Sequence, residues 1–381
     1  MKIGIPTEIR EYEHRVAITP EIVKKVVNLG CEILVQKGAG LSADIMDAAY
    51  AQAGARLVTA KEVFACQLVL KVRTPEPKEI KAMKAGTVII GMLDPLNQVS
   101  LQAMCQQGLT AFSLELLPRN TRAQSMDVLS SQANIVGYKS VLLACHYYRH
   151  FMPMLMTAAG TVKAARVLVL GAGVAGLQAI ATARRLGAVV EASDVRPAVK
   201  EQIESLGVKF LDVPYETEEE KKIAAGEGGY AGKMPESWMK RQAELVAKRA
   251  IESDIIITSA LVPGRTPPVL IGPEVVQAMK HGSVIVDLAA GFGKNGSGNC
   301  PLTSENEVVV KHGVTIVGYT NIPSLLSADA SSLYAKNVFE FLKLMITEDT
   351  NLAISKEDGL VKACLLCEKG ELSKNAIKET S

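Results

Sequence analysis

Residues 167–194 constrain the fold of this chain more than any other stretch. They read VLVLGAGVAGLQAIATARRLGAVVEASD, an apolar strand followed by a GxGxxG spacing, a helical pattern and a second strand ending at Asp194. Gly171 would allow a tight turn, Gly173 would let a pyrophosphate approach the helix N-terminus, and Gly176 would let the helix pack closely. The stretch predicts a dinucleotide-binding βαβ unit; a glycine-rich turn without a ligand is the alternative.

The end of the second strand bears on the choice of cofactor. Asp194 would accept hydrogen bonds from both hydroxyls of an adenosine ribose and would repel a 2′-phosphate. Arg196 lies two residues later, and its positive charge would favour a 2′-phosphate, which argues in the opposite direction. We predict NAD(H) rather than NADP(H). Further expected cofactor-binding residues are Val174, Val195, Arg196 and Gln242.

Short apolar runs alternate with helical patterns along the chain, which indicates parallel α/β sheets. The first series of expected strands is KIGIP, EILVQ, ARLV, LVLKV, TVIIGM and LTAFSL. The second series is RVLVL, AVVEAS, VKFLDV, DIIITS, SVIVDL and VTIVGY. The prediction is an α/β protein with two doubly wound, Rossmann-like parallel-sheet domains.

The connections between the two series predict the domain organisation. Residues 130–150 are expected to form one long helix that joins the domains. The helix SLYAKNVFEFLKLM after the last strand is expected to return to the first domain, followed by a loosely specified tail rich in Lys and Glu. The expected domains are 1–129 with 322–381, and the NAD(H)-binding domain 130–321.

Composition argues against several classes of partner. Only 4% of the 381 residues are aromatic and the net charge is +2, which disfavours nucleic acid and anionic membrane surfaces. The most apolar segment is interrupted by glycines, so it falls short of the roughly 20 apolar residues of a membrane span. With no apolar signal peptide, a cytoplasmic location is expected.

The seven cysteines are scattered, and their odd number favours reduced thiols. Cys364 and Cys367 form a CxxC, but no second pair at zinc spacing accompanies them. We expect them to fill the core or the surface, with a metal or redox role as the less favoured reading. No metal site is predicted.

Two loops are candidates for covering the cofactor. AAGEGGYAGKMPES concentrates four glycines around Tyr230, with Gly229 beside it. This segment is either a lid that closes over the cofactor and excludes water or an ordinary surface loop. TSALVPG follows a strand of the second series, which puts Leu261 either near the nicotinamide or packed on its own strand.

The segment RNTRAQSMD (119–127) carries arginines, a glutamine and an aspartate, but no histidine, lysine or cysteine. A dehydrogenase acting on an alcohol or amine needs a titratable acid or base beside the nicotinamide. This segment offers positioning groups instead. The alternative role is helix capping, with Asp127 or Ser130 starting the long helix.

The methionine-rich run FMPMLMTAAGTV (151–162) precedes the first strand of the second series. It is either core filling or an exposed arm that crosses to a second subunit, as adaptable methionine surfaces do. We favour the arm.

Four motifs carry a family resemblance: GIPTEIREYEHRVAITP, KVRTPEP, VLGAGVAGLQAIATARRLGA and RAQSMDVLSSQANIVGY. Together they resemble the alanine dehydrogenase and nicotinamide nucleotide transhydrogenase superfamily over most of the chain, and the last resembles the NAD(H)-binding component of the proton-translocating transhydrogenase branch. This resemblance implies a homodimer, held on the cytoplasmic face of the inner membrane by membrane-spanning partner subunits. It also implies direct hydride transfer to NADP⁺ on an NADP(H)-binding partner, coupled to proton translocation.

The branches differ at two positions. Alanine dehydrogenases have a lysine in the strand motif and a histidine after the next strand, where this chain has Arg73 and Asp94. Arginine does not deprotonate in proteins, so Arg73 cannot replace that lysine. Arg15 is then expected to form a structural ion pair. A self-contained alanine dehydrogenase-like enzyme and a non-catalytic NAD-sensing module are the alternative functions.

Between two nicotinamides only a hydride moves, so no general acid is needed. The resemblance implies that Gln124 contacts the nicotinamide ribose and Arg119 lies near the carboxamide. It implies that Asp127 and Ser130 anchor the loop and the ring amide and that Tyr230 closes over the cofactor. Arg122 is a further expected cofactor-binding residue on this loop.

Overall fold

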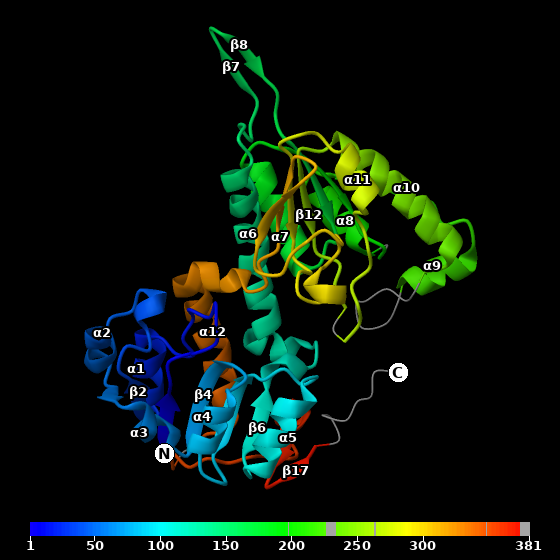
Figure 1. Ribbon diagram of the computed structural model, residues 1–381. Coiled ribbons are helices and arrows are strands. Elements are labelled where there is room, and N and C mark those ends of the chain that lie inside the picture. Colours follow the sequence, from blue (N-terminus) through cyan, green and yellow to red (C-terminus); the bar gives the residue numbers. More distant parts are fainter. Residues whose placement is uncertain (197, 226–233, 263, 348, 374–381) are drawn as a thin grey trace. The chain divides into compact units, whose positions relative to one another are not determined.

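Twelve apolar runs form parallel strands in the computed structural model, which describes residues 1–381 except 197, 226–233, 263, 348 and 374–381 (Figure 1). The chain divides into two compact units. Unit 1 is Met1–Gln132 with Pro323–Ser381, and unit 2 is Ala133–Ile322. Each unit has its own sheet and its own hydrophobic core.

Unit 1 contains an eight-stranded sheet in the order β17-β16-β6-β5-β4-β1-β2-β3. Its parallel strands are β1 (Lys2–Ile5), β2 (Glu32–Gln36), β3 (Arg56–Val58), β4 (Leu68–Arg73), β5 (Val88–Met92) and β6 (Thr110–Ser113). Two antiparallel strands, β16 (Leu365–Glu368) and β17 (Glu371–Leu372), extend the sheet beyond β6.

Helices cover both faces of this sheet, which explains the nearly continuous apolar strands. One face packs on α1 (Pro20–Asn28), α2 (Asp47–Gln52), α12 (Ser327–Leu342) and α13 (Gly359–Cys364). The other face packs on α3 (Ala60–Phe64), α4 (Pro77–Ala82) and α5 (Gln98–Gln106). Short 3-10 turns are η1 (Leu41–Ala43), η2 (Leu114–Leu116), η3 (Thr121–Met126) and η5 (Ile322–Leu326).

Unit 2 contains a seven-stranded sheet in the order β11-β10-β9-β12-β13-β15-β14. Its parallel strands are β9 (Arg166–Leu170), β10 (Val189–Ser193), β11 (Lys209–Phe210), β12 (Ile255–Thr258), β13 (Val284–Asp287) and β15 (Val314–Val317), and β14 (Val308–Lys311) is antiparallel. The chain order of the parallel strands is that of a doubly wound Rossmann sheet, whose direction of winding reverses between β9 and β12.

Helices again cover both faces of the sheet in unit 2. One face packs on α6 (Val128–Tyr147), α7 (Val174–Arg185) and α8 (Ala198–Ser205). The other packs on α10 (Glu236–Glu252) and α11 (Pro273–Ala278). The remaining elements are α9 (Glu218–Ala225) and η4 (Lys294–Gly296).

All twelve expected parallel strands are confirmed, and antiparallel strands that were not expected extend one edge of each sheet. The added strands arise from two-residue hairpin turns. His312 and Gly313 join β14 to β15, Lys369 and Gly370 join β16 to β17, and all four residues have positive φ. Such turns match the twist of antiparallel strands. The tail after α12 is therefore partly ordered into the sheet.

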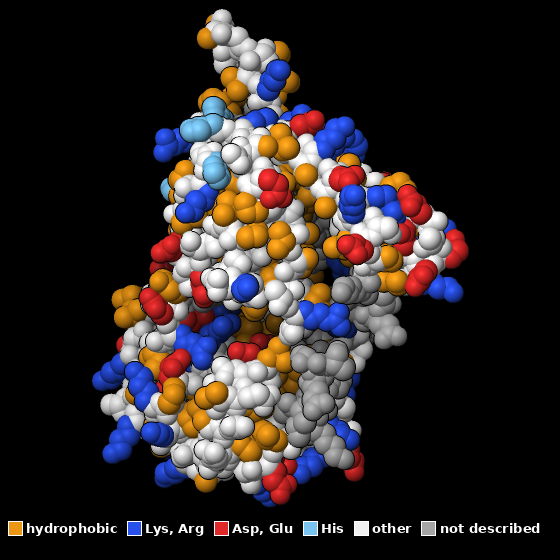
Figure 2. Space-filling model, turned by 45° about the vertical axis from the view of Figure 1, so that its right-hand side comes forward, with side chains coloured by type: hydrophobic (Ala, Val, Ile, Leu, Met, Phe, Trp, Pro, Cys, Tyr) orange, Lys and Arg blue, Asp and Glu red, His pale blue; other side chains and the backbone are white. Residues whose placement is uncertain are grey.

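The run 151–162 forms a separate hairpin, β7 (Leu155–Thr157) paired with β8 (Gly160–Val162), which projects from unit 2 (Figure 1). Met154 and Met156 are 59% and 79% exposed, and Figure 2 shows hydrophobic side chains on this projection. The core-filling alternative holds only for Met152, which is buried. Within the described residues, the helices are too short or too polar to cross a bilayer.

Candidate nucleotide site and the surrounding polar clusters

The turn between β9 and α7 has the geometry of an anion-binding helix N-terminus. Gly171 has φ +90°, and an ideal Cβ on Gly176 would lie 2.0 Å from the carbonyl oxygen of Gly171, so helix and turn meet only through glycine. Gly173 is the N-cap residue of α7; it makes no side-chain cap, and the first turn of the helix has no acidic residue. A Cβ on Gly173 would meet nothing closer than Arg196 Nη2 at 4.0 Å. The turn therefore fits a diphosphate.

Asp194 lies directly against this turn. Its carboxylate is 5% exposed; Oδ2 accepts hydrogen bonds from the Ala172 N–H (2.7 Å) and from Arg196 Nη2 (2.9 Å). Oδ1 accepts hydrogen bonds from the backbone N–H and Nε of Arg196, both at 2.9 Å. The structure thus brings together Gly171, Gly173, Asp194 and Arg196. For Asp194 to accept ribose hydroxyls, the Arg196 guanidinium must give up or share its bonds.

The carboxyl ends of β9, β12 and β13 meet beside the glycine turn. Thr258 is in register with Leu170 on one side and with Asp287 on the other. Leu261 follows β12 and is half-buried, at the topological switch point where α/β sheets bind ligands.

Other expected unit 2 residues lie on neighbouring elements. Val174, the first residue of α7, is 39% exposed. Val195 is half-buried, and its carbonyl oxygen accepts a hydrogen bond from the Tyr215 hydroxyl. Gln242 is buried within α10. Gly229 and Tyr230 lie outside the described residues.

In unit 1, the hydrophobic core and helix α12 hold the segment 119–130 in place. Ala123 and Met126 are buried in the core, which anchors η3. Asn337 on α12 donates a hydrogen bond to the Ser125 carbonyl oxygen (2.7 Å) and accepts one from the Ser131 hydroxyl (2.7 Å). Gln124 is exposed on this anchored turn, and Arg119, which precedes the turn, is exposed as well. The arrangement presents polar groups on a fixed platform.

Asp127 and Arg122 of the polar segment have structural partners. Asp127 caps α6: its carboxylate accepts hydrogen bonds from the Ser130 N–H (2.9 Å) and hydroxyl (2.6 Å). The capping alternative is therefore present for Asp127. Arg122 forms an ion pair with Asp358, the N-cap residue of α13.

The ion pair expected for Arg15 is present and fully buried. Its guanidinium donates bidentately to Glu13 at 2.7 and 2.6 Å and also donates to Gln132 Oε1 at 2.8 Å. The Arg15 and Glu13 side chains are 2% and 0% exposed. The Arg15 guanidinium is thus committed to internal contacts.

A second buried cluster was not expected from the sequence. Lys71 Nζ lies 3.1 Å from Glu8 Oε2 and 2.8 Å from Glu79 Oε1, and all three side chains are at most 4% exposed. Glu8 Oε1 also accepts the Val72 N–H. Burial raises the pKa of Glu8 despite the opposing charge of Lys71. Burial disfavours the ammonium of Lys71, but Glu8 and Glu79 outweigh it and raise its pKa.

Arg73 and Asp94 lie near the half-buried carboxyl of Glu115. Glu115 Oε2 accepts hydrogen bonds from the Asp94 backbone N–H and the Ser113 hydroxyl, both at 2.8 Å. Burial raises the pKa of Glu115, although the hydrogen bonds from the Ser113 hydroxyl and the Asp94 N–H and the charge of Arg73 oppose this; the charge of Asp94 adds a smaller upward effect.

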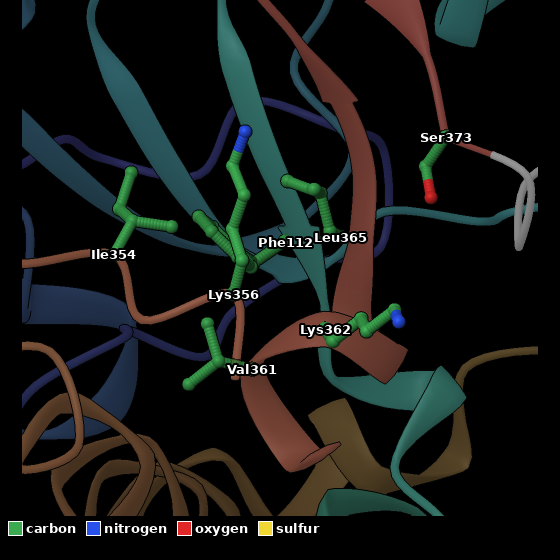
Figure 3. A pocket seen from close by; sticks show the side chains of 7 residues that line it. All are labelled: Phe112, Ile354, Lys356, Val361, Lys362, Leu365 and Ser373. Carbon is green, nitrogen blue, oxygen red and sulfur yellow. The ribbon is translucent and has the colours of Figure 1, made fainter. Parts of the chain in front are cut away.

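A small cavity of about 190 Å³ lies elsewhere in unit 1 (Figure 3). Its walls come from β6, α13, β16 and the segments beside them, and they are Phe112, Ile354, Lys356, Val361, Lys362, Leu365 and Ser373. None of the expected site residues lines it. Cys364 and Cys367 are buried nearby, in agreement with core filling. Groups of three or more metal-ligating side chains are absent from the described part of the chain.

Comparisons with known proteins cover nearly the whole chain. Residues 4–136 match the family model "Alanine dehydrogenase/PNT, N-terminal domain", and residues 140–375 match the C-terminal domain model. A Rhodospirillum rubrum relative, the first part of an NAD(P) transhydrogenase subunit alpha, is 49% identical over 98% of this chain and 97% of its own. The solved transhydrogenase from Sinorhizobium meliloti is 44% identical over 98% of each chain, with a TM-score of 0.84. A solved L-alanine dehydrogenase is 26% identical over 98% of this chain and 96% of its own, with a TM-score of 0.77.

Proposed function

Because the chain belongs to the alanine dehydrogenase/PNT family, we propose that it is the NAD(H)-binding component of a proton-translocating NAD(P) transhydrogenase. The proposed reaction is NADH + NADP⁺ → NAD⁺ + NADPH, in which a hydride passes from C4 to C4 and no proton is exchanged with either ring. NADP⁺ is held by a partner subunit. One observation carries this proposal: Gln124 on the anchored turn η3 and Arg119 just before it are exposed, and the segment 119–127 has no histidine, lysine or cysteine side chain that could act as a base near neutral pH.

In the proposed mechanism, this chain binds and orients rather than transferring protons. The N–H groups at the start of α7 bind the diphosphate, and Asp194 accepts hydrogen bonds from the adenosine ribose. Gln124 and Arg119 orient the nicotinamide end, while Asp127 and Ser130 fix the turn that carries them. NAD(H), when bound, supplies the hydride at its nicotinamide C4. Holding two rings at roughly 3 to 3.5 Å lowers the barrier to such a transfer, because the entropy of bringing them together is lost on binding rather than in the reaction step.

Reconstitution tests the proposed function. Mixed with an isolated NADP(H)-binding transhydrogenase subunit, the chain is expected to transfer hydride between the two nucleotides, measured with an NAD analogue by absorbance. Alone, it is expected not to oxidise alanine with NAD⁺, because Arg73 and Asp94 replace the lysine and histidine of that chemistry. Alanine oxidation by the pure chain would instead establish the alanine dehydrogenase-like alternative. Nucleotide binding without either activity would favour a sensor.

Cofactor selectivity gives a second test, centred on Asp194. NADH is expected to bind more tightly than NADPH. Asp194→Ala is expected to weaken NADH binding by about tenfold or more, since a charge-assisted hydrogen bond is lost. It should thereby narrow the difference between the affinities for NADH and NADPH. The same change also frees the Arg196 guanidinium to face a 2′-phosphate. Calorimetric titration measures both affinities. Asp212→Ala, at an exposed ion pair in the same unit, is the control, and equal affinities for the unmodified chain would contradict the assignment.

We also propose that the chain is a homodimer whose arm is the β7–β8 hairpin, and that its partner subunits hold it on the cytoplasmic face of the inner membrane. The exposed methionines of this projection support the arm. The double change Met154→Asp and Met156→Asp is expected to convert dimer to monomer in sedimentation. Val99→Asp, at a residue 80% exposed in unit 1, is the control. A dimer unaffected by the hairpin changes would exclude the arm.

A further inference from the structure

The end of β13 carries a buried aspartate that receives an unusual number of donors. Asp287 is 0% exposed. Its Oδ1 accepts hydrogen bonds from the Thr258 hydroxyl (3.0 Å) and from the N–H groups of Ala289 and Asn299 (3.1 Å each). Its Oδ2 accepts hydrogen bonds from the Cys300 N–H (3.0 Å) and the Thr303 hydroxyl (2.7 Å). A carboxylate satisfied in this way holds the backbone around it in one arrangement.

Asn299, one of the residues held by Asp287, closes the loop that follows β12. Its side-chain Oδ1 accepts a hydrogen bond from the Ala260 N–H at 3.1 Å, while its Nδ2 donates to the Ala260 carbonyl oxygen at 2.9 Å. The same Nδ2 donates to the Pro268 carbonyl oxygen at 2.8 Å. One buried amide therefore binds both ends of the loop, at Ala260 and at Pro268.

The residues before Leu261 are fixed one after another by different partners. Thr258 is bound to Asp287, and Ala260 is bound to Asn299. Between them, the Ser259 hydroxyl donates to the Gly171 carbonyl oxygen at 2.9 Å and its N–H donates to the Leu170 carbonyl oxygen at 2.7 Å. The segment is thus tied to the sheet on one side and to the glycine turn on the other.

We propose that Asn299, held by Asp287, is a positioning residue for hydride transfer: it fixes Ala260 and thereby sets Leu261 against the nicotinamide. This inference rests on the proposed function, which gives Leu261 its place at the cofactor. Asn299 acts only through the loop. A backbone shift at Ala260 would change the position of the nicotinamide ring. The proposed contacts of the diphosphate at the start of α7 and of the adenosine ribose at Asp194 would remain.

Asn299→Asp is the test variant, because it keeps an acceptor for the Ala260 N–H but replaces the donor facing the Ala260 and Pro268 carbonyl oxygens. We expect single-turnover hydride transfer in the reconstituted complex to fall by about tenfold or more, since misplacement of the ring costs rate before it costs binding. The dissociation constant for NADH is expected to change by less than about threefold, because the diphosphate and ribose contacts remain.

The control is Thr303→Val, which removes a donor from the opposite side of Asp287 without touching the loop. It perturbs the same buried network, so a merely structural role predicts similar losses of thermal stability and of rate in both variants. Positioning predicts a loss of rate only for Asn299→Asp. If that variant fails to fold, Leu261→Ala takes its place and is expected to lose rate with NADH binding retained.

The outcomes separate this inference from the proposed function. Absence of transfer by the unmodified complex would refute the proposed function, and the placement of Leu261 with it. If the wild-type complex transfers hydride normally and Asn299→Asp does so at the same rate, the positioning role alone is overturned. Where Asn299→Asp does not fold, an unchanged rate in Leu261→Ala has the same consequence. A loss of rate explained wholly by weaker NADH binding would overturn it as well.

Discussion

Replacing Lys71 with methionine is expected to lower the free energy of unfolding of the protein by about 3 to 5 kcal/mol, because it leaves buried charges without their partner. The Lys71 ammonium is 1% exposed and lies between Glu8 and Glu79. Methionine preserves much of the side-chain volume, so the loss reports the charge rather than a cavity. Urea unfolding at neutral pH measures the difference.

The matched control is Glu8→Gln, which keeps the shape of the side chain and an acceptor for the Val72 N–H. Burial already raises the pKa of Glu8, against the attraction of Lys71 and with the repulsion of Glu13 and Glu79. Because Lys71 keeps Glu79 as its ion-pair partner in this variant, the neutral replacement of Glu8 is expected to lower the free energy of unfolding by less than about 1 kcal/mol or to raise it.

The pH dependence of this pair of variants has a definite sign. With a folded-state pKa above its unfolded value, Glu8 binds its proton more tightly in the folded protein. The contribution of this protonation to the free energy of unfolding is fully present below the pKa of Glu8 in the unfolded chain. It is lost as the pH rises through the pKa of Glu8 in the folded protein. Glu8→Gln should therefore gain stability relative to the wild type across that window. A relative loss with rising pH, or a Lys71→Met variant as stable as Glu8→Gln, would contradict this account.

The parallel strands of both units could be predicted because each is a local apolar run bounded by polar or glycine-rich segments. Residues 167–170 and 255–258, for example, are buried in the sheet and are nearly uniformly apolar in sequence. Because helices cover both faces of the sheet, these strands need no alternation of apolar and polar residues, and the helical connections between them favour parallel pairing. The glycine turn was predictable for the same reason, since all its requirements lie within a few residues.

The antiparallel edges were missed although a local signal existed. His312-Gly313 and Lys369-Gly370 are two-residue turns with a glycine in second place, and each separates two short strand-forming runs. Turn residues of this kind between two such runs are typical of a hairpin. The prediction of parallel sheets depended on strands that alternate with helices. A hairpin added at the edge of such a sheet has no helix between its two strands, so this pattern does not predict it.

The buried polar clusters could be predicted only in part. Lys71 stands in the apolar run of β4, and a lysine in a doubly covered strand requires a buried counter-charge. That signal was available, but the identity of the partner was not, because Glu8 follows another strand and Glu79 lies on a helix. Asn299 had no signal at all, since its role depends on the path of a loop far from it in the sequence.

Replacing Gln124 with asparagine is expected to slow single-turnover hydride transfer in the reconstituted complex by about a hundredfold. The change keeps the amide but shortens its reach by one methylene. Because Ala123 and Met126 are buried and Asn337 holds Ser125, the turn cannot move to compensate for the missing length. The ring would then be misplaced by about 1 Å, the scale at which such losses occur.

NADH binding by this variant is expected to change only slightly, since the proposed binding contacts are at the glycine turn and Asp194, away from the nicotinamide. Stopped-flow transfer measured beside equilibrium titration separates rate from affinity. Gln102→Asn makes the same chemical change at an exposed position on α5 and should leave both quantities unaltered. An unchanged transfer rate in Gln124→Asn, or a loss fully accounted for by weaker NADH binding, would remove Gln124 from the residues that orient the ring.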